Sequence, residues 1–267
     1  MIALLRRSAF QARFALTATL LLLLGFQILI IGQAAEIQRT NAFASMANLM
    51  PGFLQRGLGS RAMLLASFKG TVAFGYFHPI VCMTVSVLAM YLATEPAHEV
   101  ESGLVDLELA RAVPRHYLVT RSLALAHGAA GAALLLMAAG TMIGVRVFSA
   151  DSFDPPSAPM RTRLLVNHFA VASCFASFAV LLASRARRWS SAFTAAALSA
   201  VVLYNVDFIA LGWQPMRSVA WISPFHYYPA LSVLAGEAPT ARNLAILFTA
   251  SAAFAAAAYW QFERRDL

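Results

Sequence analysis

Side chains able to do acid, base, nucleophilic or metal chemistry are sparse in this sequence. His127 and His168 each stand alone among apolar residues, which is more typical of packing than of a ligand or proton carrier. Cys82 and Cys174 have no Cys or His nearby at the spacing of metal ligands, so we interpret both as small buried residues. The motifs H-E-x-x-H and G-x-S-x-G and paired intramembrane aspartates are absent, which argues against an enzyme.

The sequence also lacks the phosphate-binding loop of an ATPase. That loop, G-x-x-x-x-G-K-[ST], needs a lysine followed by serine or threonine. The only lysine, Lys69, is followed by Gly70. We therefore expect this chain to bind no cofactor, so any ATP-driven work must use ATP and Mg²⁺ held by another chain.

Asp207 is an acid inside the apolar run Ser190–Gly212. A charge at the bilayer centre costs about 2.5–3.5 kcal/mol on insertion scales. At ~1.5 Å per residue, however, Asp207 lies roughly 26 Å along a helix from Ser190, close to the membrane surface. An interfacial anchor and a substrate pathway both remain open for Asp207 and for its neighbours Tyr204 and Asn205.

The elements that must position these residues are membrane-spanning helices. The composition is 60% hydrophobic and only 12% charged, which indicates an integral membrane protein. A spanning helix needs about 20 mostly apolar residues. The runs are continuous rather than alternating, so they predict an all-α fold and not a barrel. We expect a single transmembrane domain, 1–267, with six spans at 14–31, 71–94, 122–145, 164–183, 190–212 and 243–260, the second of them kinked at Pro79.

The densest run of charge, Glu99–Arg121, lies between the second and third spans. Val100, Leu104 and Leu107 fall at i, i+4 and i+7, so they would share one stripe of an amphipathic helix flanked by acids. Membrane segments on both sides would hold this helix at the bilayer surface. We expect it to meet a soluble partner.

Arginine density predicts the orientation. With the N-terminus inside, basic residues are about twice as dense on the cytoplasmic side as outside. Both termini and the Glu99–Arg121 helix are then cytoplasmic. The net charge of +8 needs no nucleic acid to explain it, because basic flanks suit anionic lipid headgroups.

The stretch EVESGLVDLELARAVPRHYLVTR resembles the cytoplasmic loop of the type-2 export permeases of ATP-binding-cassette (ABC) transporters. Ala112, Pro114 and Leu104 depart from that loop's usual proline, serine and threonine. Two other stretches, SPFHYY from Ser223 and FERRDL from Phe262, resemble further elements of the same permeases. The matching positions of the loop are Glu99, Glu101, Gly103, Leu107, Leu109, Ala110, Val113, Arg115 and Arg121.

The resemblance implies a permease subunit in the bacterial inner membrane that docks on a separate ABC ATPase and pairs with a second copy or a paralogue. It implies export, and it leaves open the substrate, the choice between homodimer and heterodimer, and the need for a periplasmic partner. A scaffold that anchors an ATPase without transport is the alternative. The implied ATPase-coupling residues are Glu99, Glu101, Gly103, Leu104, Leu107, Glu108, Arg111 and Arg115. The candidates for a pathway or outer gate are Tyr204, Asn205, Asp207, Pro224, Phe225, His226 and Tyr227, with Ser223–Tyr228 expected to re-enter the membrane surface.

Overall fold

The structure, a computed structural model, describes residues 2–43, 45, 52, 64–105, 114–150, 152–237 and 241–265. Within these ranges every regular element is a helix, which confirms the all-α fold. The helices are α1 (Ile2–Gln11), α2 (Arg13–Arg39), α6 (Phe68–Phe77), α7 (Pro79–Ala93), α8 (Glu95–Glu101), α10 (His116–Phe148), α11 (Ala158–Ala183), α12 (Trp189–Ala210), α13 (Gln214–Arg217), η1 (Ala220–Ile222), η2 (Pro224–Tyr227), α14 (Ala230–Leu234) and α15 (Ala241–Glu263).

Within the part of the chain that the structure describes, six helical stretches are long and apolar enough to cross a membrane. They are α2, α6 with α7, α10, α11, α12 and α15, and each overlaps one of the six predicted runs. Several helices continue past the predicted apolar runs. The third span begins at His116 rather than Ser122, because Arg121 is buried against α8 and does not face water.

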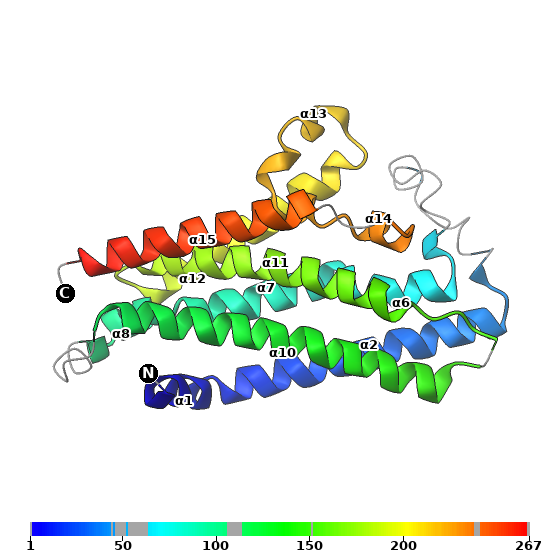
Figure 1. Ribbon diagram of the computed structural model, residues 1–267, viewed down its shortest axis with the longest axis horizontal. Coiled ribbons are helices and arrows are strands. Elements are labelled where there is room, and N and C mark those ends of the chain that lie inside the picture. Colours follow the sequence, from blue (N-terminus) through cyan, green and yellow to red (C-terminus); the bar gives the residue numbers. More distant parts are fainter. Residues whose placement is uncertain are drawn as a thin grey trace.

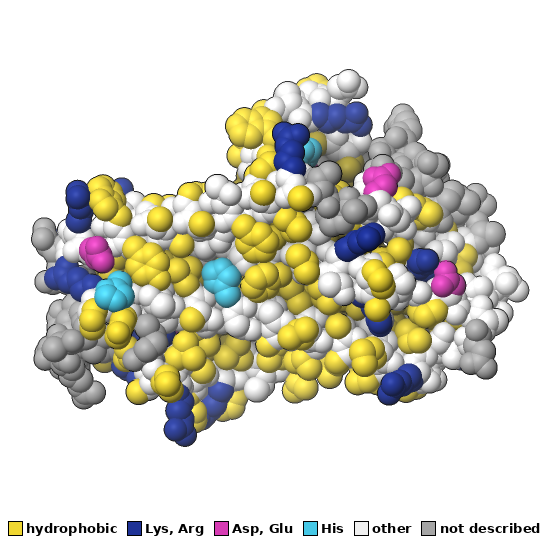
Figure 2. Space-filling model, viewed as in Figure 1, with side chains coloured by type: hydrophobic (Ala, Val, Ile, Leu, Met, Phe, Trp, Pro, Cys, Tyr) yellow, Lys and Arg dark blue, Asp and Glu magenta, His cyan; other side chains and the backbone are white. Residues whose placement is uncertain are grey.

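The spanning helices lie side by side along the long axis of the molecule (Figure 1). α11 lies centrally and contacts α7, α10, α12 and α15. Its buried residues fall on all sides of the helix, as expected of a helix surrounded by others. Figure 2 shows the complementary outer surface, where hydrophobic side chains cover most of the bundle and charged ones gather toward its ends and its projecting lobe.

Small residues bring α2 and α10 close together. Gly140 and Gly144 form a G-x-x-x-G pair on α10, a spacing that lets membrane helices approach closely. A Cβ atom at Gly144 would lie 2.7 Å from Cδ1 of Ile31, and one at Gly140 would lie 3.1 Å from the carbonyl oxygen of Leu24. The first and third spans therefore touch backbone to backbone.

The kink expected at Pro79 is a full break between α6 and α7. His78 adopts an extended ψ of 135°, and its Nδ1 accepts a hydrogen bond from the N–H of Ile80 at 3.2 Å. In an unbroken helix that N–H would go to the carbonyl of Tyr76. Proline has no N–H to offer either. The break thus frees backbone carbonyls inside the second span.

The segment between α12 and α15 is folded and does not form a simple loop. α13 projects from the side of the bundle, whereas η2 and α14 pack back onto α11 (Figure 1). Both described chain ends lie at the same end of the bundle as α8. We call this the α8 end.

Candidate functional site

Two acids of α8 enclose an arginine of α10 at the α8 end. Arg121 is completely buried, and its Nη1 and Nη2 donate to Oε1 and Oε2 of Glu99 at 2.8 and 2.7 Å. Its Nε lies 3.7 Å from Oε2 of Glu95. Glu95 and Glu99 are four residues apart, so both project from one face of α8. We call these three residues the charge clamp. Buried charges need such pairing, so the clamp fixes α8 against α10.

The clamp corrects one expectation. Glu99 is only 2% exposed, so the prediction that it faces a soluble partner is wrong for this conformation. The run of charge on one helix indicates polar faces, but it does not show which acid is paired across the chain. Arg121, which the sequence indicated only as a position matching the permease loop, is that missing partner.

Glu101 joins α8 to a second spanning helix. Its Oε2 accepts a hydrogen bond from the backbone N–H of Trp189 at 2.8 Å. Trp189 is the first residue of α12, so the carboxylate satisfies a free N–H at the positive end of that helix. The indole Nε1 of Trp189 also donates to Oγ1 of Thr94 at 3.0 Å. α8 is therefore tied to both α10 and α12.

The predicted amphipathic helix is broken after α8. α8 ends at Glu101, Gly103 has φ +70°, a left-handed conformation that terminates helices and favours glycine, and Leu104 and Val105 are helical again. The single stripe through Val100 and Leu104 is thus interrupted, although Val105 is buried in the core. Three predicted coupling residues, Leu107, Glu108 and Arg111, lie outside the described residues.

Arg115, the last predicted coupling residue, lies just before α10. Its Nη1 donates to the carbonyl oxygen of Arg265 at 2.6 Å and to that of Glu263 at 3.3 Å. These carbonyls belong to the C-terminal end of α15, where backbone acceptors lack helical partners. The exit of the predicted coupling stretch is therefore attached to the sixth span.

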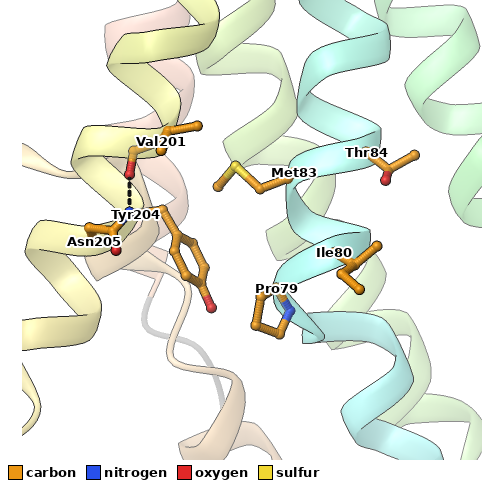
Figure 3. A pocket seen from close by; sticks show the side chains of 7 residues that line it. All are labelled: Pro79, Ile80, Met83, Thr84, Val201, Tyr204 and Asn205. Atoms are coloured by element: carbon orange, nitrogen blue, oxygen red, sulfur yellow. Dashed lines mark hydrogen bonds between the residues drawn. The ribbon is translucent and has the colours of Figure 1, made fainter.

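An open groove of about 400 Å³ lies between α7 and α12. Figure 3 shows the side chains of Tyr204 and Met83 pointing into the space between the two helices, beside Pro79 at the start of α7. The Asn205 amide is turned to its own helix, where it donates to the carbonyl of Val201 at 2.8 Å. The lining is mostly apolar and consists of Pro79, Ile80, Met83, Thr84, Val201, Tyr204 and Asn205.

The predicted gate residues fall into two groups. The Phe225 ring is buried, and its centroid lies 5.1 Å from that of Tyr204 beside the groove. Asp207 instead lies 3.4 Å from Nδ1 of His226, a partner the sequence did not identify. Ser223 is fully buried and caps η2, so this element packs into the bundle as a re-entrant structure would. The other two gate candidates, Pro224 and Tyr227, are half-buried within η2.

A further polar cluster surrounds Tyr76, just before the break in the second span. The freed carbonyl of Tyr76 lies 3.0 Å from Nδ1 of His168 and 3.4 Å from the hydroxyl of Tyr228, which donates to it. The Tyr76 hydroxyl is hydrogen-bonded to the Thr141 hydroxyl. The Thr141 hydroxyl also accepts a hydrogen bond from Nε2 of Gln27 at 3.1 Å. Only the His78-Pro79 pair and the isolated Gln27 in an apolar run could have indicated this cluster from sequence.

The expectation that His168 is a packing residue agrees with its burial and its bond to the Tyr76 carbonyl. His127 likewise contacts only the carbonyl of Leu123 in its own helix among the hydrogen bonds seen, at 2.7 Å. Cys82 and Cys174 are buried and free. Across the described ranges, no three His, Cys, Asp or Glu side chains are grouped as a metal site would require.

Comparison with known families gives one match that spans nearly the whole chain. Residues 6–263 match the family described as the C-terminal domain of the multidrug efflux system permease Rv1217c. No curated protein and no solved structure matches. This match agrees with the resemblance of Glu99–Arg121 to export permeases and with six membrane-spanning helices. The chain belongs to the family of the multidrug efflux permease Rv1217c, C-terminal domain.

Proposed function

We propose that this chain is the membrane-spanning subunit of an ATP-driven exporter of apolar solutes. A separate ABC ATPase, holding ATP and Mg²⁺, would dock at the α8 end, and a second permease copy or paralogue would complete the transporter. The observation that carries the proposal is the attachment of α8 to two spans, through Glu99 to Arg121 and through Glu101 to Trp189. A push on α8 would move α10 and α12 together.

The orientation belongs to the same proposal. The α8 end would be cytoplasmic, in the inner membrane of a bacterium, as arginine density predicts. The described chain ends lie with α8 at one end of the bundle, which suits an even number of crossings (Figure 1).

The groove between α7 and α12 is the proposed path of the solute. Its lining is mostly apolar, with the Tyr204 ring available for stacking on aromatic solutes. The groove lies between a helix that starts at a proline break and a helix whose first residue is held by Glu101. Movement of α8 would therefore change the width of the groove.

Reconstitution of the chain with its ATPase in vesicles tests the proposal. We expect ATP-dependent movement of a lipophilic fluorescent dye, and none when the phosphate-loop lysine of the ATPase is replaced. Dye should also stimulate ATP hydrolysis. Hydrolysis that proceeds without any dye movement, for dyes of several shapes, would instead identify a scaffold that anchors the ATPase.

A further inference from the structure

A second arginine, Arg265, extends the contact that Arg115 makes with the end of α15. Its Nη2 donates to the carbonyl oxygen of Ala186 at 2.7 Å, and its Nη1 donates to those of Ser184 at 3.1 Å and Ala183 at 3.5 Å. α11 ends at Ala183, so these are the carbonyls that a helix end leaves without partners. A guanidinium fork reaches several such acceptors at once and suits the negative end of a helix.

The two arginines form a series. Arg115 is the last residue of the predicted coupling stretch Glu99–Arg115, which we call the docking stretch, and it binds the backbone carbonyl of Arg265. The Arg265 side chain then binds the turn that joins α11 to α12. Partial burial lowers the pKa of Arg265, and the charge of nearby Arg187 lowers it further, but an arginine stays protonated in proteins. The carbonyls thus compensate a charge held close to another cation.

The packing of α15 does not depend on this series. Phe262 is fully buried, and the Ser251 hydroxyl binds both the Ser177 hydroxyl at 2.9 Å and the Ser173 carbonyl at 3.1 Å. Arg264, the residue before Arg265, is exposed, and its guanidinium carbon lies 4.4 Å from the centroid of the Trp260 ring. Adjacent arginines therefore differ in role, which supplies a matched control.

We propose that Arg265 is a positioning residue that transmits displacement of the docking stretch, through Arg115, to the α11–α12 turn. This inference rests on the proposed function. The charge clamp holds the entrance of the stretch to α10, whereas the Arg115–Arg265 series holds its exit to α11 and α15. ATP-driven movement at the docking stretch then reaches the fourth, fifth and sixth spans as one unit.

The test compares Arg265→Gln with Arg264→Gln, each reconstituted with the ATPase. We expect Arg265→Gln to bind the ATPase and keep its basal hydrolysis, while dye moved per ATP falls about tenfold, within the range of ordinary coupling between sites. Arg264→Gln should move as much dye per ATP as wild type. Arg265→Lys should recover only part of the lost dye movement, since an ammonium lacks the forked donors of a guanidinium. The double variant Arg115→Gln with Arg265→Gln should lose no more dye movement per ATP than the more impaired of the two single variants.

A fluorophore on Ser190→Cys, exposed in the first turn of α12, gives a readout independent of dye. The background carries Cys82→Ala and Cys174→Ala. In the wild-type sequence, ADP-vanadate should change its emission, and Arg265→Gln should abolish the change; if Arg265→Gln accumulates poorly, Arg265→Lys is measured instead. Three outcomes would overturn this inference and leave the proposed function standing. They are an emission change that persists in Arg265→Gln, losses of dye movement that add in the double variant, and an equal loss of dye movement in Arg264→Gln. Absence of both dye movement and the emission change in the parent protein overturns the proposed function and this inference with it.

Discussion

The two ends of α7, the second helix of the second span, lie beside opposite kinds of contact. At the α8 end, Glu99 and Arg121 form a bidentate pair that is sealed from solvent. At the Pro79 break, the same span faces an open and mostly apolar groove toward α12. Ion pairs and hydrogen bonds are directional, so the first region holds its geometry. Apolar contacts are not directional, so the second region, if it is the proposed solute path, would accept solutes of different shapes.

The difference implies that damage at the clamp appears as lost stability and damage at the groove as lost affinity. Arg121→Met would leave the buried Glu99 and the partly buried Glu95 without this arginine. We expect a loss of about 3–5 kcal/mol in the free energy of unfolding, measured by denaturation in detergent. Adding Glu99→Met should recover part of this loss. Lys69→Met removes an exposed pair with Asp154 (3.3 Å) and should cost at most about 1 kcal/mol; equal losses would contradict the distinction.

A packing change tests whether rigidity extends along the first and third spans. Gly144→Val places atoms where Ile31 already lies, so we expect a loss of about 1–3 kcal/mol in the same denaturation assay. Ile31→Ala should relieve it. Gly128→Ala, where a Cβ meets no atom within 4 Å, is the control and should be neutral or stabilising. A Gly144→Val protein as stable as wild type would mean that these two spans separate readily.

The groove predicts the converse outcome. Tyr204→Ala removes an aromatic face from the lining, and we expect dye affinity to fall about tenfold, or about 1.4 kcal/mol, with the ATPase still bound. Dye affinity is measured as the dye concentration that gives half-maximal transport. Leu198→Ala, exposed on the same helix outside the groove, should leave that concentration unchanged. A drop in ATPase binding by Tyr204→Ala would show that groove and docking end are not separate.

One hydroxyl links the groove side to the Tyr76 cluster. Tyr228→Phe removes a donor to the freed Tyr76 carbonyl, and we expect a loss of about 0.5–1.5 kcal/mol in unfolding free energy. Tyr227→Phe is the control, because its hydroxyl donates to the Trp221 carbonyl in a more exposed setting where water can replace it. A larger loss for Tyr227→Phe than for Tyr228→Phe would place the critical bond outside the bundle.

Hydrophobic length was sufficient to predict the spans. Each of the six apolar runs is long enough to cross the membrane as a helix. A single segment in lipid can pair its own backbone N–H and C=O groups only as a helix, so the fold class follows from local sequence. The break at Pro79 also follows, since proline lacks an N–H. The start of the third span at His116 does not follow from the apolar run, because the polar residues before Ser122 are stabilised by distant groups. One of these groups is the Tyr259 hydroxyl, which is hydrogen-bonded to Thr120 at 2.8 Å.

The sites depend on contacts that no local pattern encodes. Glu99 and Arg121 lie 22 residues apart, and their pairing depends on how α8 folds back on α10. The i, i+4, i+7 spacing of Val100, Leu104 and Leu107 predicts a helix that runs through Gly103, whereas the positive φ of this glycine interrupts it. The groove lies between helices that are far apart in sequence, so only the packed bundle defines it.

The Tyr76 carbonyl has a consequence for how this protein is made. Its donors, His168 and Tyr228, are translated after the second span itself. In lipid, an unsatisfied backbone carbonyl costs several kcal/mol, and a span broken at proline cannot close that bond by itself. The second span is therefore poorly suited to enter the bilayer alone. It can complete the hydrogen bonds of the Tyr76 carbonyl only after the fourth span and the segment after the fifth have been made, so we expect the second span to reach its final packing late.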